Sequence, residues 1–98
     1  MPTLTAPGLV SSREQARQLI EELPLDLSDC AVHLDCSGLE IGTSSFVDEL
    51  VKACLVERHA RLLSFDSAPI RIAQLALRAA KNHGVADRLE VHRVEQGA

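Results

Sequence analysis

Aromatic residues and long apolar runs are the scarcest features of this sequence. Its 98 residues include two Phe and neither Trp nor Tyr, so it lacks the side chains on which single-stranded nucleic acids and sugars usually stack. No stretch approaches the roughly 20 apolar residues that cross a bilayer. Residues 1–12, MPTLTAPGLVSS, also lack a basic segment followed by an apolar one. We therefore expect neither a signal peptide nor a membrane partner.

The chain also lacks an excess of positive charge. Ten Lys and Arg stand against fourteen Asp and Glu, which gives a formal net charge of −4. The basic residues form no cluster along the sequence, and a chain of this charge is repelled by the phosphates of a nucleic acid. We expect no nucleic-acid partner.

Motifs for disulfides, metals and nucleotides are missing as well. The three cysteines, Cys30, Cys36 and Cys54, are an odd number without a CxxC pair, which favours reduced thiols in a cytoplasmic protein. The four histidines lack the spacing of a zinc site. Gly38 and Gly42 fit neither a Walker loop nor GxGxxG. We expect no metal site and no cofactor.

Hydrophobic residues make up 46% of the chain, and their spacing predicts a first helix near Ser12. Ser12 and Gln15 have the spacing of a capping box. Ser11 and Glu14 offer the same spacing one residue earlier. Four apolar residues at helical intervals form the predicted buried stripe: Ala16, Leu19, Ile20 and Leu23. Pro24 is expected to end the helix.

A central strand is predicted over Cys30–Cys36, CAVHLDC, and its composition favours burial on both faces. Residues 37–43 form the following loop. Gly38 and Gly42 are expected to allow a positive φ there. Leu39 and Ile41 are expected to anchor this loop to the core.

A second helix is predicted from Ser44 or Ser45, because Ser45 and Asp48 again have capping-box spacing. Six apolar residues form its broad buried face: Phe46, Val47, Leu50, Val51, Cys54 and Leu55. A short strand over residues 61–65 and a turn over 66–68 precede a third helix that starts at Pro69. Ile72, Leu75, Ala76 and Ala79 mark the buried side of that helix. Gly84 ends it, and a last strand covers residues 89–92.

The predicted order of elements is (β)αβαβαβ, where the first strand, around residues 3–5, is optional. Helices that alternate with strands imply right-handed crossovers and a mostly parallel sheet. We therefore predict an α/β fold, a small sheet of three or four strands with helices packed against it. The chain, residues 1–98, is expected to be one domain with a core over about residues 11–93 and tails at 1–10 and 94–98.

The central stretch, LDCSGLEIGTSSFVDELV, resembles the signature of the STAS fold of anti-sigma-factor antagonists. In that family a strand with an acidic or amide end leads into a loop, a D-S-S-G-like turn and a helix. Ser44 takes the position of the family's phosphorylatable serine and Ser45 that of the second serine. Thr43 replaces the usual Asp, and Phe46 replaces the usual Gly. These departures make the chain most similar to the short bacterial STAS-like domains of unknown function.

The resemblance implies a non-enzymatic regulatory module that binds a protein partner in the cytoplasm. In the family this partner is a GHKL-type kinase that is also an anti-sigma factor, and phosphorylation releases it. Ser44 is then the candidate phosphoacceptor, with Ser45 and Thr43 as second choices. The residues expected to contact the partner are Gly38, Glu40, Gly42, Thr43, Ser44, Ser45 and Asp48. The chain itself is expected to be a monomer or a weak homodimer.

Other interpretations remain open at this stage. The hydroxyls at residues 43–45 are also ordinary helix caps. Asp35 and Asp66 should lie at the carboxyl ends of neighbouring parallel strands, where a small ligand or a metal ion such as Mg²⁺ would bind, in an enzyme or a binding domain. Cys36 and His33 are only three residues apart on one strand and lie on opposite or offset faces, so they are poorly placed to form a nucleophilic pair. A subunit that self-associates through apolar helix faces is a third class.

Overall fold

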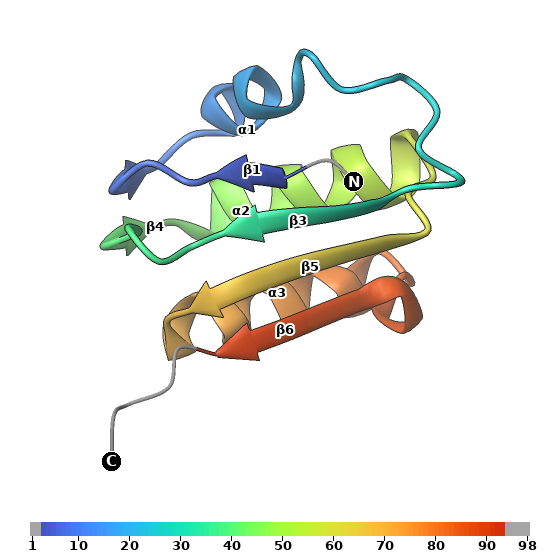
Figure 1. The fold of residues 1–98 in the computed structure, drawn as a ribbon. Coiled ribbons are helices and arrows are strands. Elements are labelled where there is room, and N and C mark those ends of the chain that lie inside the picture. Colours follow the sequence, from blue (N-terminus) through green and yellow to red (C-terminus); the bar gives the residue numbers. More distant parts are fainter. Residues whose placement is uncertain (1–2, 94–98) are drawn as a thin grey trace.

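The main sheet has four parallel strands. The computed structural model describes residues 3–93 and shows an α/β fold (Figure 1). Its strands are β1 (Thr3–Thr5), β3 (Ala31–Asp35), β5 (Leu62–Ala68) and β6 (Leu89–Arg93), in the order β1-β3-β5-β6. The predicted class is confirmed, with four strands rather than three. The predicted tail over residues 94–98 lies outside the described residues.

Helices α2 (Ser44–Val51) and α3 (Ile70–Asn82) cover one face of this sheet, and α1 (Arg13–Ile20) packs against α2 beside the β1 edge (Figure 1). Every crossover advances the sheet in the same direction. Because such crossovers are right-handed, they place the helices on the same side. The expectation that β3 is covered on both faces is therefore wrong. Val32 and Leu34 lie in the core, whereas His33 and Asp35 are partly exposed.

A second, two-stranded sheet lies at the carboxyl end of the main one. Strand β2 (Leu9–Val10) pairs in parallel with β4 (Ile41–Gly42). The carbonyl oxygen of Gly8 accepts hydrogen bonds from the backbone N–H groups of Glu40 at 2.8 Å and Ile41 at 2.9 Å. Residues 3–10 are therefore part of the fold, and the optional first strand is β1.

Helix α1 begins as predicted and ends earlier than predicted. Ser12 is the N-cap, and Ser12 and Gln15 form the capping box. The helix stops at Ile20, four residues before Pro24. The guanidinium of Arg58 donates hydrogen bonds to the carbonyl oxygens of Ile20 at 2.8 Å and Leu23 at 2.9 Å. These bonds satisfy carbonyl groups that a longer helix would have used, so the chain leaves the helix before the proline.

The core is aliphatic and lies between the sheet and the helices. Its largest fully buried side chains are Phe46, Phe65, Ile20, Leu27, Leu34, Leu50, Leu55 and Leu63, with four valines. The six predicted apolar residues of the second helix are all buried. Helix α2 continues into a π-helical segment, Lys52–Glu57. No helix in residues 3–93 is both long enough and apolar enough to cross a bilayer.

Strand β5, Leu62–Ala68, begins one residue later than predicted and ends three residues later. Residues 66–68 extend the pairing with β6 through a bulge instead of forming a turn. Ser67 has a φ of 54°, an uncommon value for a residue with a side chain, at this irregularity. Helix α3 ends at Asn82 with His83 as its C-cap, and Gly84 follows as the predicted C′ residue with a φ of 71°. The N–H of Val85 donates to Ala80, and that of Gly84 to Lys81, a Schellman motif.

Candidate functional site

Thr43 caps helix α2 and leaves Ser44 free. Its hydroxyl accepts a hydrogen bond from the N–H of Phe46 at 3.4 Å. The predicted capping box of Ser45 and Asp48 is wrong, because the helix begins at Ser44, one residue after its cap. Ser44 is exposed and Ser45 is half-buried. Within residues 3–93 the hydroxyl of Ser44 has no hydrogen-bond partner in the structure, so capping does not occupy it.

Thr43 also ties the starts of two helices together. Its hydroxyl donates a hydrogen bond of 2.9 Å to the carbonyl oxygen of Ser11, next to the cap of α1. Its N–H donates to the carbonyl oxygen of Val10 at 3.1 Å. Thr43 thus connects the starts of α1 and α2 through hydrogen bonds. Ser44 lies directly after Thr43, at a fixed position.

The loop before α2 is exposed except for one anchor. Gly38 and Glu40 are exposed, and Leu39 is buried. Ile41, predicted to be a second anchor, is 60% exposed, because its strand pairs only with β2 and its side chain points away from the core. Its partner in that pair, Leu9, is 56% exposed. Two apolar side chains therefore lie side by side near Ser44.

Gly42 is required for close packing and not for an unusual backbone. Among the described glycines only Gly84 has a positive φ, so the expectation of positive φ at Gly38 and Gly42 is wrong. A Cβ at Gly42 would lie 2.6 Å from Cδ1 of Ile72 and 3.3 Å from Cγ2 of Val10. The glycine lets the β2–β4 pair approach α3. At Gly38 nothing lies within 4 Å of such a Cβ.

Asp48, expected to contact a partner, lies where three helices meet. Its carboxylate pairs with Arg13 of α1 at 2.8 Å and with Nε2 of His83, the C-cap of α3, at 2.9 Å. Burial disfavours the charged form, but the hydrogen bonds from Arg13 and His83 outweigh it and lower the pKa of Asp48. Its role in the structure is to hold helices together.

Glu49 extends this network into the helix interface. Its carboxylate is nearly buried and contacts Arg13 at 3.2 Å and Arg17. Arg17 also binds both carboxylate oxygens of Glu57, at 2.6 and 2.8 Å. The hydrogen bond from Arg17 lowers the pKa of Glu57. These ion pairs fix α1 against α2 and its π-helical extension.

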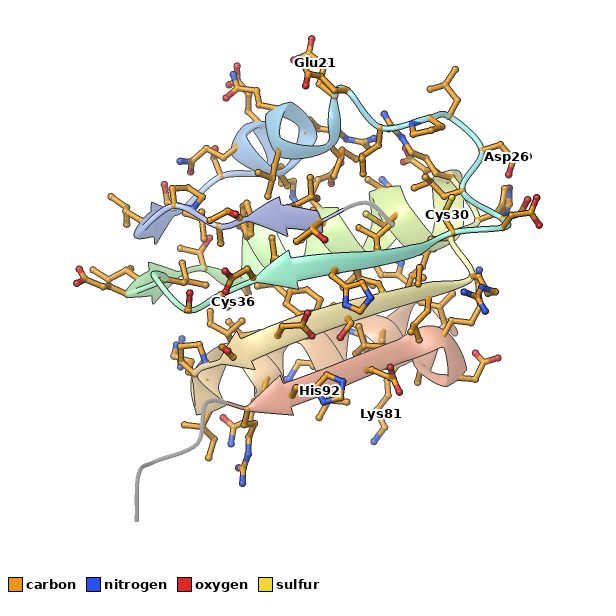
Figure 2. All side chains as sticks on the ribbon, viewed as in Figure 1. Glu21, Asp26, Cys30, Cys36, Lys81 and His92 are labelled. Atoms are coloured by element: carbon orange, nitrogen blue, oxygen red, sulfur yellow. The ribbon has the colours of Figure 1, made fainter. Side chains whose placement is uncertain are left out.

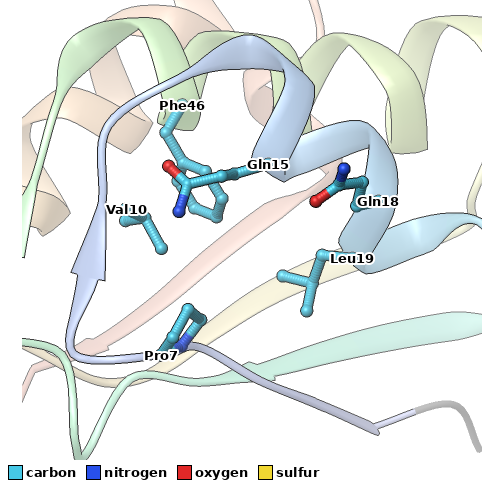
Figure 3. A pocket seen from close by; sticks show the side chains of 6 residues that line it. All are labelled: Pro7, Val10, Gln15, Gln18, Leu19 and Phe46. Carbon is cyan, nitrogen blue, oxygen red and sulfur yellow. The ribbon is translucent and has the colours of Figure 1, made fainter.

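A shallow pocket of about 280 Å³ lies between α1, the β1–β2 segment and the start of α2 (Figure 3). Phe46, two residues after Ser44, closes its inner end, and Val10 and Leu19 form apolar walls. Pro7, Gln15 and Gln18 form the rim. The side chain of Gln15 already serves the cap of α1. The pocket is small and mostly apolar, and Ser44 is not one of its lining residues.

The uncovered face of the main sheet is polar. Two rows of register partners cross it: Thr3, His33, Ser64 and Glu90 in one row, and Thr5, Asp35, Asp66 and His92 in the other. Figure 2 views this face, with His92 labelled on its last strand. Asp35 and Asp66 are direct neighbours in the register, as expected. Their position at neighbouring strand ends is therefore confirmed.

The polar side chains of this face are engaged with one another. Asp66 accepts a hydrogen bond from the buried hydroxyl of Ser64 and lies 3.0 Å from Nδ1 of His33. Asp35 accepts from the N–H of Ser37 at 2.9 Å, which lowers the pKa of its carboxyl. The carboxylate lies between serine and histidine, whereas a catalytic triad needs the histidine between serine and carboxylate. This order gives Ser64 no general base.

The cysteines are small core residues or lie near the surface. Cys36 and Cys54 are buried and Cys30 is partly exposed, and all three are free thiols. Burial raises the pKa of both buried thiols to about 12, with the charges of Asp35 and Asp66 adding to the effect at Cys36. A thiol with this pKa is not a nucleophile at neutral pH. Within residues 3–93, no group of three or more His, Cys, Asp or Glu side chains is placed to hold a metal ion.

Two features of the site have no signal in the sequence. The exposed pair of Leu9 and Ile41 depends on a two-residue parallel contact between segments about 30 residues apart. The pocket at Phe46 depends on where α1 packs. Comparisons of the chain with protein-family models, with curated proteins and with solved structures found no match.

Proposed function

We propose that this chain is a STAS-like, non-enzymatic regulatory module that binds a protein partner in the cytoplasm, with Ser44 as the phosphorylated switch. The partner is a GHKL-type kinase that also acts as an anti-sigma factor. The proposal rests on the different roles of two neighbouring residues at the start of α2. Thr43 caps the helix, and the exposed hydroxyl of Ser44 remains free for a kinase.

The position of Ser44 suits a phosphate electrostatically. Ser44 is the first residue of α2, where backbone N–H groups have no partner inside the helix and the helix dipole is positive. A phosphate brings about −1.5 to −2 charges at neutral pH. The fold would accept these charges at this position, because free N–H groups point toward it.

The surroundings of Ser44 suit a partner protein that dissociates when Ser44 is phosphorylated. Leu9 and Ile41 form an exposed apolar pair near the start of the helix. A partner protein that covers this pair would have to remove water from a phosphate on Ser44, and this cost weakens the complex. Glu40 is exposed in the same loop and adds negative charge. We therefore propose that phosphorylation changes the partner surface and leaves the domain folded.

The test combines capture of the partner with the intact mass of the recovered chain. Tagged wild-type chain is compared with Ser44→Ala, Ser44→Asp and the matched control Ser45→Ala, in cytoplasm from the source cells supplied with ATP. Wild type and Ser45→Ala should gain one phosphate and Ser44→Ala none. The kinase should be recovered with Ser44→Ala and lost with Ser44→Asp.

Stability has to stay constant for this result to be interpretable. Exposed substitutions of this kind change the free energy of unfolding by about 0.5 kcal/mol or less, which shifts the melting temperature of a small domain by about 2–4 °C. A chain that stays unmodified in every capture contradicts the switch. A phosphate on Ser44→Ala would move the switch to another residue.

The alternative function is a small-ligand or metal-binding domain, or an enzyme, at Asp35 and Asp66. The pairing of these two carboxylates across β3 and β5 favours it. A Mg²⁺ ion held there would raise the melting temperature, and the increase would grow with the logarithm of the Mg²⁺ concentration above the Kd. The measurement is thermal unfolding with and without Mg²⁺, for wild type and for Asp66→Asn. A Mg²⁺-dependent increase seen only in wild type would favour this alternative over the switch.

A further inference from the structure

The outer edge of β6 is free. This strand pairs with β5 on one side and is the last strand of the sheet. In the part of the chain that the structure describes, no strand pairs with its other side (Figure 1). An edge of this kind presents backbone N–H and C=O groups that another strand can use. With five residues, β6 is long enough for such pairing, whereas the opposite edge strand, β1, has three.

The side chains of β6 are complementary to those of an identical strand that runs in the opposite direction. Glu90 and His92 flank the central residue Val91 and lie on the uncovered face of the sheet. Both side chains are more than half exposed, 54% and 62%, and a carboxylate oxygen of Glu90 lies 3.9 Å from Nε2 of His92, whose imidazole is charged only when it is protonated. If a second β6 lies antiparallel with its Val91 opposite Val91, each Glu90 faces a His92 of the second copy. A carboxylate directly across from an imidazole accepts a hydrogen bond from the ring N–H, and a protonated imidazole adds the attraction of opposite charges.

We propose that two copies of this chain associate through β6, antiparallel about a twofold axis at Val91, and join their sheets into one of eight strands. The register follows from the charges. A shift by two residues in one direction would place two Glu90 carboxylates opposite each other, and like charges disfavour this. A shift in the other direction would place two His92 side chains opposite each other and leave Glu90 without a His92 across from it. A parallel arrangement in the same register would do the same. Only the antiparallel register centred on Val91 places each Glu90 opposite a His92.

Helix α3 provides the apolar surface that this arrangement covers. A hollow of about 470 Å³ is lined by Gln74, Leu77, Arg78, Lys81 and Ala86. Leu77 is 49% exposed. Ala86 begins the short 3₁₀ turn, Ala86–Arg88, that leads directly into β6. The hollow therefore opens beside the edge where the second copy would lie.

The lengths of α3 and β6 bring the two leucines together. A helix of 13 residues is about 20 Å long, and a strand of five residues is about 17 Å long. Leu77 lies near the middle of α3, as Val91 lies in the middle of β6. A twofold axis through Val91 then places α3 of the second copy beside the first, with Leu77 near Leu77. The pairing thus gains apolar burial in addition to backbone hydrogen bonds.

The test uses two variants of β6. Two copies of the same variant should repel each other, whereas one copy of each should attract. The double variant Glu90→Lys with His92→Lys has only positive charges on the uncovered face of β6. The single variant His92→Glu has only negative charges there. The molar mass of the complete 98-residue chain is measured by sedimentation over a range of concentrations. Circular dichroism first confirms that both variants are folded, as their exposed positions lead us to expect.

Wild type should change from monomer to dimer as its concentration rises. Each variant alone should need about tenfold more protein, the factor that corresponds to about 1.4 kcal/mol. An equimolar mixture of the two should dimerise at least as readily as wild type. Leu77→Glu, tested separately, should weaken the dimer with its β6 charges intact.

Three results would overturn the proposal. Wild type that stays monomeric up to millimolar concentration excludes the dimer. Variants that dimerise alone as readily as wild type exclude β6 as the interface. A mixture that is no tighter than either variant excludes the register centred on Val91. Hydrogen exchange provides an independent measurement, because the amides of residues 89–93 should become more protected as wild type dimerises.

Discussion

At the scale of single residues, the missing side chain of Gly42 lets the β2–β4 pair lie close to α3. We predict that Gly42→Ala lowers the free energy of unfolding by about 1–3 kcal/mol, the range typical of an overpacked core. Its Cβ would lie 2.6 Å from Cδ1 of Ile72, which is itself buried and has little room to turn. Urea unfolding followed by circular dichroism measures the change.

Gly38→Ala is the matched control for this prediction. Gly38 lies in the same loop, has no positive φ, and has open space where a Cβ would be. Alanine there should be neutral or slightly stabilising, because it reduces the freedom of the unfolded chain. Equal losses for both variants would show that the loop tolerates no substitution, and that contact with Ile72 is not the reason.

Thr43 supports a second prediction at this scale. Thr43→Ala removes the acceptor for Phe46 N–H and the donor to Ser11, and should cost about 1 kcal/mol. Thr43→Ser keeps both hydrogen bonds and should recover most of the loss. The same denaturation assay applies. If Ser behaved like Ala, the methyl group of Thr43 would be responsible in place of its hydroxyl.

At the scale of elements, α1 is held to α2 by an ion-pair network around a nearly buried carboxylate. Arg17→Met leaves Glu49 with Arg13 alone and breaks the bidentate pair with Glu57. We predict a loss of about 1–2 kcal/mol, less than for a fully buried pair because Arg17 is 40% exposed. Chemical denaturation of the variant measures this loss.

Arg13→Met is the matched control for the network. Arg13 contacts the same carboxylate but is 54% exposed, so its replacement should destabilise the fold less than Arg17→Met does. Combining Arg17→Met with Glu49→Leu removes the stranded charge and should restore part of the stability. A double variant that is additive would show that Arg17 and Glu49 are not coupled.

Elements whose signals are local could be predicted from the sequence. The capping box of Ser12 and Gln15 and the helix end at Gly84 depend on residues a few positions apart, and both are confirmed. The uncovered sheet face also had a signal that the prediction missed. Polar residues alternate in β3, β5 and β6, as His33 with Asp35, as Ser64 with Asp66 and as Glu90 with His92. The prediction considered β3 alone and so missed that all three strands place polar residues on the same face.

Long-range contacts account for what could not be predicted. The cap at Thr43 was expected one or two residues later, because three consecutive hydroxyls satisfy the same local rule. The structure selects Thr43 since its hydroxyl also reaches Ser11, 32 residues earlier. In the same way, Asp48 was expected to contact a partner, and its bonds within the chain were not predicted. Its pairs with Arg13 and His83 join elements far apart in the sequence.

At the scale of the whole molecule, we predict that the free energy of unfolding is nearly constant over a middle range of pH. It should fall on the acidic side and on the alkaline side for different reasons. The pKa values of Asp48 and Glu57 are lowered in the folded state. Their contribution is therefore present above their ordinary values of 3.8 and 4.5 and is lost as the pH falls through that range and below. The pKa values of Cys36 and Cys54 are raised from 9.0 to about 12. Their contribution is present below pH 9 and is lost between pH 9 and about 12.

Urea midpoints measured from pH 3 to 11 test both limits. Cys36→Ala should flatten the alkaline decline relative to its own plateau, whatever its absolute stability. Asp48→Asn should flatten the acidic decline in the same way. An alkaline decline that is unchanged in Cys36→Ala and in Cys54→Ala would assign this limit to other groups.

The strand order β1-β3-β5-β6 never reverses along the sheet. In α/β sheets where the order does reverse, two neighbouring crossovers leave on opposite faces and open a crevice at the carboxyl ends of the strands, which is where ligands bind. Each crossover between these four strands advances in one direction, so the chain is singly wound and has no such switch point. Its architecture therefore does not create a ligand crevice at Asp35 and Asp66. The two surfaces that we propose for recognition, the start of α2 and the edge of β6, are both outer surfaces that need no such crevice.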